Sequence, residues 1–236
     1  MPLPIRAVAT RFDPRRVGSL GLWVDFSDAS TVTLDTSSPA KVSQVNDKSG
    51  NGRNMTQTTA SDRFVLGTIN GLTCADFGTA AASTVGMNFS SISMFEAHLV
   101  LTAEGHAGNA FDDYNALLTG NAGGLQGQAP FNRFYPNAAG GFGTPAQLNA
   151  TSIANMDSTG NQGIFPTITS PCVFQMWQTS AYTGITRFGN DRGIASRAWK
   201  GRVGEVLVFT ANLNDDSRRA IRRYLAYKWQ ITAAIP

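Results

Sequence analysis

The sequence predicts an all-β fold, one large β-sandwich followed by one amphipathic helix near the C-terminus. Three observations support this prediction. The chain of 236 residues is 42% hydrophobic but only 15% charged, against about 25% charged in a typical globular domain. Several short segments alternate apolar and polar residues with a period of two, which is typical of strands. One segment near the C-terminus carries apolar residues at helical spacing.

The first expected strand covers residues 20–26, in which the apolar residues at even positions form one apolar face. Residues 94–101 and 172–177 alternate in a similar way. Each of these two strands is therefore expected to have one core face and one mixed face. Shorter strands are expected at residues 41–45 and 72–77.

Residues 203–209, with the sequence VGEVLVF, are apolar on nearly both faces. This predicts a central strand that is covered on both sides. The helix that follows can provide one cover, because Asn214 is a good N-cap and Asp215 and Asp216 place negative charge on the first turn. We expect the helix to run to about Trp229. The stripe expected to pack on the sheet consists of Ala220, Ile221, Tyr224, Leu225 and Trp229.

The opposite face of this helix is strongly basic. It carries Arg218, Arg219, Arg222 and Arg223. A run of charge of this kind usually forms a solvated face, which is what we expect here. The alternative is a basic patch that binds an acidic partner surface.

Residues 1–19 are expected to form an extended N-terminal arm, ahead of a single domain at 20–236 that includes the helix at 215–229. Prolines at positions 2, 4 and 14 oppose regular structure in the arm. The arm is also basic, with Arg6, Arg11, Arg15 and Arg16 faced by the single acid Asp13. Such an arm either binds a neighbouring subunit or docks on its own domain.

Residues 120–163 differ from the rest of the chain. The segment is rich in Gly, Asn and Ala, and only Arg133 and Asp157 are charged. It still carries four aromatic residues, Phe131, Phe134, Tyr135 and Phe142. A long uncharged segment with aromatics either packs on its own sheet or is buried at an interface.

Charge and hydropathy favour neither nucleic acid nor membrane. The formal net charge is only +3, without dense Lys/Arg runs. No stretch approaches the roughly 18 apolar residues needed to span a bilayer. The first twelve residues lack an apolar core of signal-peptide length, so we expect the chain to stay in the cytosol or to leave only within a larger assembly. Cys74 and Cys172 are expected to be small buried hydrophobes, with a disulfide as the alternative.

Two sets of residues form motifs at opposite ends of the predicted domain. The first, in LGLWVDFSDASTVTL and VSQVNDKSGNGRNMTQ, consists of Leu22, Trp23, Asp25, Asp28, Asp47 to Gly52, Thr56 and Gln57. The second, in WKGRVGEVLVFTANLNDDSRRAIRRYLAYKW, consists of Gly201, Val203, Glu205, Val206, Tyr224, Leu225, Lys228 and Trp229. Together they resemble the opening and closing stretches of laminin-G-like, concanavalin A-like jelly-roll domains of bacteriophage and bacterial surface proteins.

The resemblance implies that the sandwich is an antiparallel jelly roll in one domain. One departure is Val45, at a place where these domains often carry Trp, so nearby side chains must fill the missing volume. Residues 105–165 match no part of the pattern. The resemblance implies little about function, because this sandwich hosts lectins, glycanases and structural proteins alike.

An enzymatic function is not expected. Glycanases on this fold share an acidic Glu-x-Asp-x-x-Glu strand motif, because glycoside hydrolysis needs two carboxylates about 5–9 Å apart. The chain has three glutamates, Glu96, Glu104 and Glu205, and none has a second acid at alternate spacing. His98 and His106 are not at metal-ligand spacing. We therefore expect no catalytic residues, no metal and no cofactor, a structural Glu205, and a surface or hydrogen-bonded His98.

The expected function is that of a bacteriophage virion structural protein, such as a capsid decoration (cement) or tail-associated protein, assembled in the host cytoplasm. Its partners would be capsid or tail proteins of the same particle. A homo-oligomer is also expected, with a trimer as one option. Attachment is assigned to the arm and loops, through Arg6, Arg11, Arg15, Arg16, Phe131, Phe134, Tyr135 and Phe142.

The alternative function is a carbohydrate-binding adhesin module that recognises cell-surface glycans. Sugar sites combine an exposed aromatic platform with polar groups, in some proteins with Ca²⁺ held by oxygen ligands. The candidate platforms are Trp177, Trp199 and Tyr135. The candidate oxygen ligands are Asp25, Asp28 and Asp47. Buried tryptophans and turn-forming aspartates would explain the same residues without any ligand.

Overall fold

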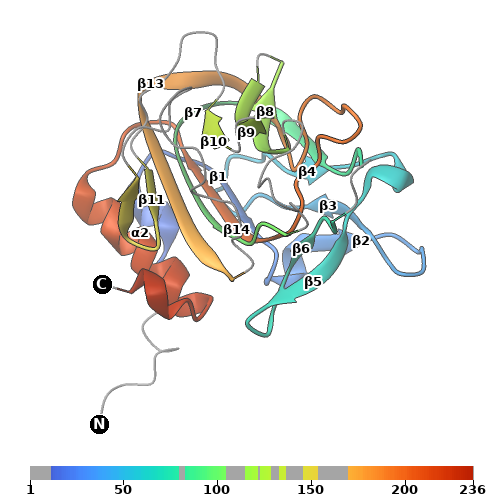
Figure 1. The fold of residues 1–236 in the computed structure, drawn as a ribbon, viewed down its shortest axis with the longest axis horizontal. Coiled ribbons are helices and arrows are strands. Elements are labelled where there is room, and N and C mark those ends of the chain that lie inside the picture. Colours follow the sequence, from blue (N-terminus) through green and yellow to red (C-terminus); the bar gives the residue numbers. More distant parts are fainter. Residues whose placement is uncertain are drawn as a thin grey trace.

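The computed structural model describes residues 12–79, 83–104, 115–121, 123–128, 133–136, 146–153 and 170–235. These residues form a strand-rich structure with a helix near the C-terminus (Figure 1), so the all-β prediction is confirmed. The strands are β1 (Leu20–Asp25), β2 (Val32–Leu34), β3 (Val42–Val45), β4 (Met55–Thr56), β5 (Val65–Ile69), β6 (Leu72–Asp76), β7 (Met87–Leu101), β8 (Ala116–Gly120), β9 (Gly123–Gln128), β10 (Arg133–Pro136), β11 (Ala146–Leu148), β12 (Thr151–Ile153), β13 (Cys172–Phe188) and β14 (Arg202–Phe209). The helices are α2 (Asp215–Lys228) and the 3-10 turns η1 (Pro14–Val17), η2 (Ala29–Thr31), η3 (Ala60–Asp62) and η4 (Thr232–Ala234).

The strands form one antiparallel sheet. Its main path runs β10-β9-β8-β13-β7-β14-β6-β5. Strand β14 is central, because it pairs with β7 along one edge and with β6 and β1 along the other. The short strands β2, β3 and β4 join the sheet through the first part of β7.

The two longest strands curl the sheet. Strand β13 pairs with β11 over residues 174–176 and with β8 over residues 185–188. Its ladder with β7 has register shifts between these two parts. Irregularities of this kind bend a strand and increase its twist. The sheet therefore curls so that strands from its opposite ends share one core.

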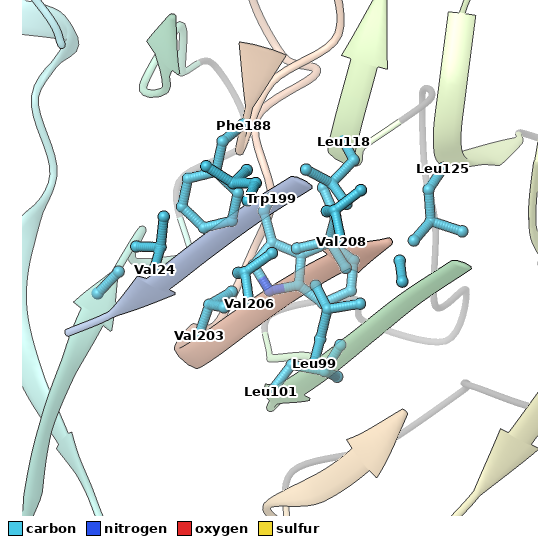
Figure 2. Close-up of a cluster of buried hydrophobic side chains, with 14 of the residues drawn as sticks. Val24, Leu99, Leu101, Leu118, Leu125, Phe188, Trp199, Val203, Val206 and Val208 are labelled. Atoms are coloured by element: carbon cyan, nitrogen blue, oxygen red, sulfur yellow. The ribbon is translucent and has the colours of Figure 1, made fainter. Parts of the chain in front are cut away.

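This first core lies on the inner face of the curled sheet. Figure 2 shows labelled side chains from several strands gathered around the ring of Trp199, which is only 1% exposed. They include Val24, Leu99, Leu101, Leu118, Leu125, Phe188, Val203, Val206 and Val208. Val45 also belongs to this core and is fully buried.

A second core lies between the outer face of the sheet and α2. It contains Trp23 of β1, Leu207 of β14, and Ile221 and Leu225 of α2. The prediction of a central strand covered on both faces is confirmed, because residues 203–209 are all buried. The prediction of a single apolar face for the first strand is wrong, since Trp23 packs on the outer face while its neighbours fill the inner core.

The helix begins where the sequence predicts. The Asn214 side chain accepts a hydrogen bond from the backbone N–H of Ser217 at 2.8 Å, which caps the first turn. The helix ends at Lys228, one residue before the expected Trp229. Among the described residues, no helix is long and apolar enough to cross a membrane.

One buried carboxylate fixes the C-terminal half of α2 to the sheet. Glu205 on β14 is fully buried. Its Oε1 accepts hydrogen bonds from Nε1 of Trp23 at 2.8 Å and from the hydroxyl of Tyr224 at 2.7 Å. Its Oε2 accepts from Nζ of Lys228 at 2.7 Å and from Nε1 of Trp229 at 2.9 Å. Glu205 is therefore structural, as expected.

Residues 12–19 pack on the domain and do not extend away from it. Pro14 begins η1, and the Asp13 carboxylate caps this turn by accepting from the backbone N–H of Arg15 at 3.0 Å. The Phe12 ring lies 5.4 Å from the ring of Tyr224, measured between centroids. The expectation that Pro14 opposes regular structure is therefore corrected, because proline fits the first position of a helical turn. Arg6 and Arg11 lie outside the described residues.

The neutral segment is described only in part. Phe131 and Phe142 lie outside the described residues, and Phe134 and Tyr135 are described only as backbone of β10. Cys74 and Cys172 are both buried and free, which confirms the expectation of two small buried hydrophobes. Burial raises the pKa of the Cys74 thiol to about 12, with smaller contributions from nearby charges.

The residue that caps the end of α2, Trp229, lies against Gly204 of β14. A Cβ atom at this position would lie 2.7 Å from Cη2 of Trp229. Real Cβ atoms do not approach an aromatic ring this closely, and Trp229 is fully buried. Glycine is therefore needed at position 204 so that the indole can lie against β14.

We expect Gly204→Ala to lower the free energy of unfolding by about 1–3 kcal/mol, because the added methyl group overpacks the contact with Trp229. Urea unfolding of the variant and the wild type measures this difference. Thr33→Ala on the exposed edge of β2 is the control, with an expected change below about 0.5 kcal/mol. Equal unfolding midpoints for Gly204→Ala and the wild type would contradict the packing described.

Candidate functional site

The outer face of the sheet carries two cross-strand rows beneath the first half of α2. One row places Glu96 of β7 between Phe209 of β14 and Trp177 of β13. The next row places His98 of β7 beside Gln175 of β13. Cross-strand neighbours of this kind lie about 5 Å apart, so their side chains interact directly.

Arg218 of α2 binds the first row. Its Nη2 lies 2.5 Å from Oε1 of Glu96, and its Nε lies 3.1 Å from both carboxylate oxygens. The guanidinium carbon also lies over the ring of Trp177, 4.5 Å from the centroid. The backbone N–H of Leu213 donates to the same Glu96 oxygen at 2.6 Å. Glu96 therefore anchors both the helix start and Arg218.

The protonation states of Glu96 and His98 follow from the groups that hydrogen-bond to them. Burial by itself would raise the pKa of Glu96, but hydrogen bonds from His98 and Arg218 outweigh it and lower the pKa. His98 Nε2 lies 3.1 Å from the Glu96 carboxylate, and His98 Nδ1 lies 2.6 Å from Nε2 of Gln175. The amide of Gln175 donates, so Nδ1 must accept and the imidazole is neutral.

His98 is fully buried, and burial is the largest cause of its lowered pKa. Its neighbours agree with the neutral form, because Nε2–H donates to Glu96 and Nδ1 accepts from Gln175. The expectation of a hydrogen-bonded histidine is confirmed, and the surface alternative is wrong.

Arg222, one turn after Arg218, binds the second row. Its Nη1 lies 2.6 Å from Oε1 of Gln147 on β11 and 3.5 Å from Oε1 of Gln175. The residue is only 8% exposed. Within the described part of the chain, its Nε is buried without a hydrogen-bond partner. Burial, followed by the charges of Arg219 and Arg223, lowers the pKa of Arg222.

These side chains line an open pocket with a volume of about 220 Å³. The pocket lies between α2, β11 and β13. Its lining residues are Gln147, Trp177, Asp215, Arg218, Arg219 and Arg222. We call this site the arginine pocket.

The expectation of a solvated arginine face on α2 is only half right. Arg219 and Arg223 are exposed, whereas Arg222 is buried and the Arg218 side chain is 13% exposed. The reason is spacing. Arg218 and Arg222 are four residues apart, so both point to the same side of the helix, where the sheet supplies polar partners.

The two tryptophans proposed as sugar platforms have different environments. Trp177 is half-buried and lines the arginine pocket. Trp199 is buried in the inner core, and its Nε1 donates to the carbonyl of Thr102 at 3.0 Å. The expectation that Trp199 offers a surface platform is therefore corrected. The third candidate, Tyr135, has no described side chain.

The remaining candidate residues lie elsewhere. Arg15 and Arg16 are exposed on η1, and Val17 of the same turn packs against the second core. Arg15 pairs with Asp13 at 2.8 Å, and this pair raises the pKa of the Arg15 guanidinium. Neither arginine lines the arginine pocket.

The three aspartates considered as calcium ligands bind protein donors. Lys48 Nζ lies 2.8 Å from Asp25 and 2.7 Å from Asp28, and Lys228 Nζ lies 2.7 Å from the other oxygen of Asp25. The hydrogen bond from Lys48 is the largest cause that lowers the pKa of Asp28 to about 2. Asp47 accepts backbone N–H groups from β1 and from its own turn. Among the described residues, no group of three or more His, Cys, Asp and Glu side chains could hold a metal ion.

The sequence analysis did not identify Glu96, His98 and Gln175 as the polar groups beneath the arginines of α2. Glu96 and His98 sit at alternate positions of a largely apolar strand, and Gln175 does the same on the neighbouring strand. Polar residues on a face that also carries Val100 signal buried hydrogen-bond partners. That signal identifies the polar row but not the helix that covers it.

No protein-family model, curated protein or solved structure matches this chain. The family is therefore not shown by comparison. The arginine pocket combines guanidinium donors, an amide, a carboxylate and an indole.

The neutral state of His98 predicts a pH dependence. The folded pKa of His98 lies below its ordinary value of 6.5, so the unfolded chain takes up this proton first. Stability from this source is complete above about pH 6.5 and is lost as the pH falls toward the folded pKa, by at most about 1.4 kcal/mol per pH unit. Urea unfolding between about pH 8 and pH 5 should show this loss in the wild type. The non-titrating His98→Gln should have a flatter profile, and parallel profiles would contradict the assignment.

Proposed function

We propose that this chain is a laminin-G-like, concanavalin A-like jelly-roll domain that serves as a non-enzymatic structural protein of a bacteriophage virion, as a capsid decoration or tail-associated protein. The observation that carries the proposal is the convergence of the two sequence motifs. Residues that resemble the opening and the closing of such domains contact each other in space, although they lie about 180 residues apart in the chain.

The contacts join the two motifs directly. Trp23 of the opening motif donates to Glu205 of the closing motif. Asp25 of the opening motif pairs with Lys228 of the closing motif at 2.7 Å. Within the opening motif, the Asp47 carboxylate accepts a hydrogen bond from the backbone N–H of Trp23 at 3.0 Å and so holds Trp23 in place. Each motif therefore supplies hydrogen-bond partners to the other. This is a physical reason for the two motifs to occur together in one domain.

The proposal of a non-enzymatic role rests on how the glutamates are used. Glu96 and Glu205 are fully buried, and each accepts hydrogen bonds at both carboxylate oxygens. Glu104 accepts from the hydroxyl of Thr102 at 2.8 Å and lies 3.6 Å from Arg202. A glycosidase acid needs access to its substrate, so these positions favour structural roles.

Attachment to the particle is proposed for the N-terminal residues and the neutral segment, with capsid or tail proteins as partners and a homo-oligomer as the assembled form. The packing of Phe12 against Tyr224 limits how many N-terminal residues can be deleted in a test of this role. A deletion that includes Phe12 would also disturb the second core, whereas a deletion of residues 1–11 removes no described residue.

We expect deletion of residues 1–11 to abolish incorporation into particles that lack this protein, while urea unfolding of the domain stays unchanged. Co-sedimentation with purified particles measures incorporation. A full-length control, Thr33→Ala on the exposed edge of β2, lies outside the proposed attachment residues and should keep the binding. Full occupancy by the deleted chain would contradict attachment through these residues.

A second candidate function is glycan recognition, and the half-buried Trp177 in an open pocket is the observation that favours it. A glycan array with the wild type and Trp177→Ala, with and without calcium, is the measurement. Hits that disappear in Trp177→Ala are expected, and they should not depend on calcium. An array without hits would remove this candidate and leave the virion proposal untouched.

A further inference from the structure

One guanidinium group of the arginine pocket has no carboxylate partner among the described residues. Three guanidinium groups line it, those of Arg218, Arg219 and Arg222. Arg218 contacts Asp215 on the rim at 3.0 Å and the buried Glu96 at 2.5 Å, so its charge is matched. Arg219 lies 3.5 Å from the exposed Asp216. The unmatched charge lies farther along the helix.

Arg222 is the group that lacks a counter-charge. No carboxylate of the described residues lies within 4.0 Å of its guanidinium, and its protein partners are the neutral amides of Gln147 and Gln175. The residue is more than nine-tenths buried, and its Nε–H is unpartnered within the described chain. A buried cation in this state carries a desolvation cost that an anion in the pocket would offset.

The rim restricts which anion fits. The Asp215 side chain is 87% exposed, so it is available as a hydrogen-bond acceptor and repels further negative charge. Gln147 also lines the pocket and offers an amide. A ligand with one carboxylate next to several hydroxyl groups suits both the basic and the acidic side of the pocket. Its carboxylate can bind Arg222 and Arg219, and its hydroxyl groups can donate to Asp215. An acidic peptide, which brings several carboxylates, does not.

Size and shape support one ring of this kind. The pocket volume is about 220 Å³, below the roughly 300–1,000 Å³ of pockets for drug-sized ligands. One face of the Trp177 ring is covered by the Arg218 guanidinium. The pocket therefore offers charge and hydrogen bonds for recognition more than an open aromatic face.

We propose that the arginine pocket binds a single acidic sugar unit, a hexuronate type of residue of a glycan, through Arg222 and Arg219 with Asp215 and Gln147 on its hydroxyls. This inference rests on the second candidate function, glycan recognition, and is independent of the virion role. It specifies the class of sugar and the residues that select it.

Isothermal titration with sodium glucuronate, glucose and glutarate tests the proposal. We expect saturable glucuronate binding in roughly the millimolar range for one small ring, and at least about tenfold weaker binding of glucose and glutarate. Arg222→Gln should weaken glucuronate binding about tenfold or more. The control Arg223→Gln, an exposed arginine of the same helix outside the pocket, should change it less than about twofold.

Each other outcome overturns the inference in a different way. No saturation by glucuronate, or equal loss in both arginine variants, removes the assigned site. If glutarate binds as tightly as glucuronate, the pocket binds a carboxylate without recognising hydroxyl groups. That result would favour an acidic peptide as the ligand. Glucose bound as tightly as glucuronate, with the binding lost in Trp177→Ala, leaves glycan recognition standing and removes the acidic-sugar assignment. A urea unfolding midpoint of Arg222→Gln equal to that of the wild type verifies that the fold of the variant is intact.

Discussion

The fold depends on one buried carboxylate, Glu205, which joins the sheet to the helix that covers it. Four donors meet its two oxygens, and they come from β1 and from the end of α2. A buried carboxylate is tolerated only when its hydrogen-bonding capacity is filled. The position of α2 on the sheet and the burial of Trp23 are therefore coupled through the same group.

A second buried carboxylate, Glu96, has the matching role at the start of the helix. It binds the backbone N–H of Leu213 and the guanidinium of Arg218. With its two ends held by Glu96 and Glu205, α2 cannot shift along the sheet without breaking charged hydrogen bonds. This fixed position sets the distance between Arg222 and β11, and therefore the width of the arginine pocket.

The sequence predicts the parts of this structure that are local. Alternation and apolar content identify β1, β7 and β14, and Asn214 marks the helix start. Contacts between distant segments are not visible in local patterns. Arg218 and its partner Glu96 are 122 residues apart in the chain, so the arginines could only be predicted as a solvated face or a patch. The second half of β13, with polar residues between 178 and 186, was missed because its pairing with β8 depends on register shifts in a bent strand.

The free energy of unfolding of Glu205→Gln, compared with Glu104→Gln, tests the central claim most directly. An amide keeps the size of the side chain but places a donor where two donors already point. Removing one partner of a buried charge pair costs about 3–5 kcal/mol, so we predict a loss of this size for Glu205→Gln. The partly exposed Glu104 should lose less than about 1 kcal/mol. Equal losses at the two positions would contradict the account.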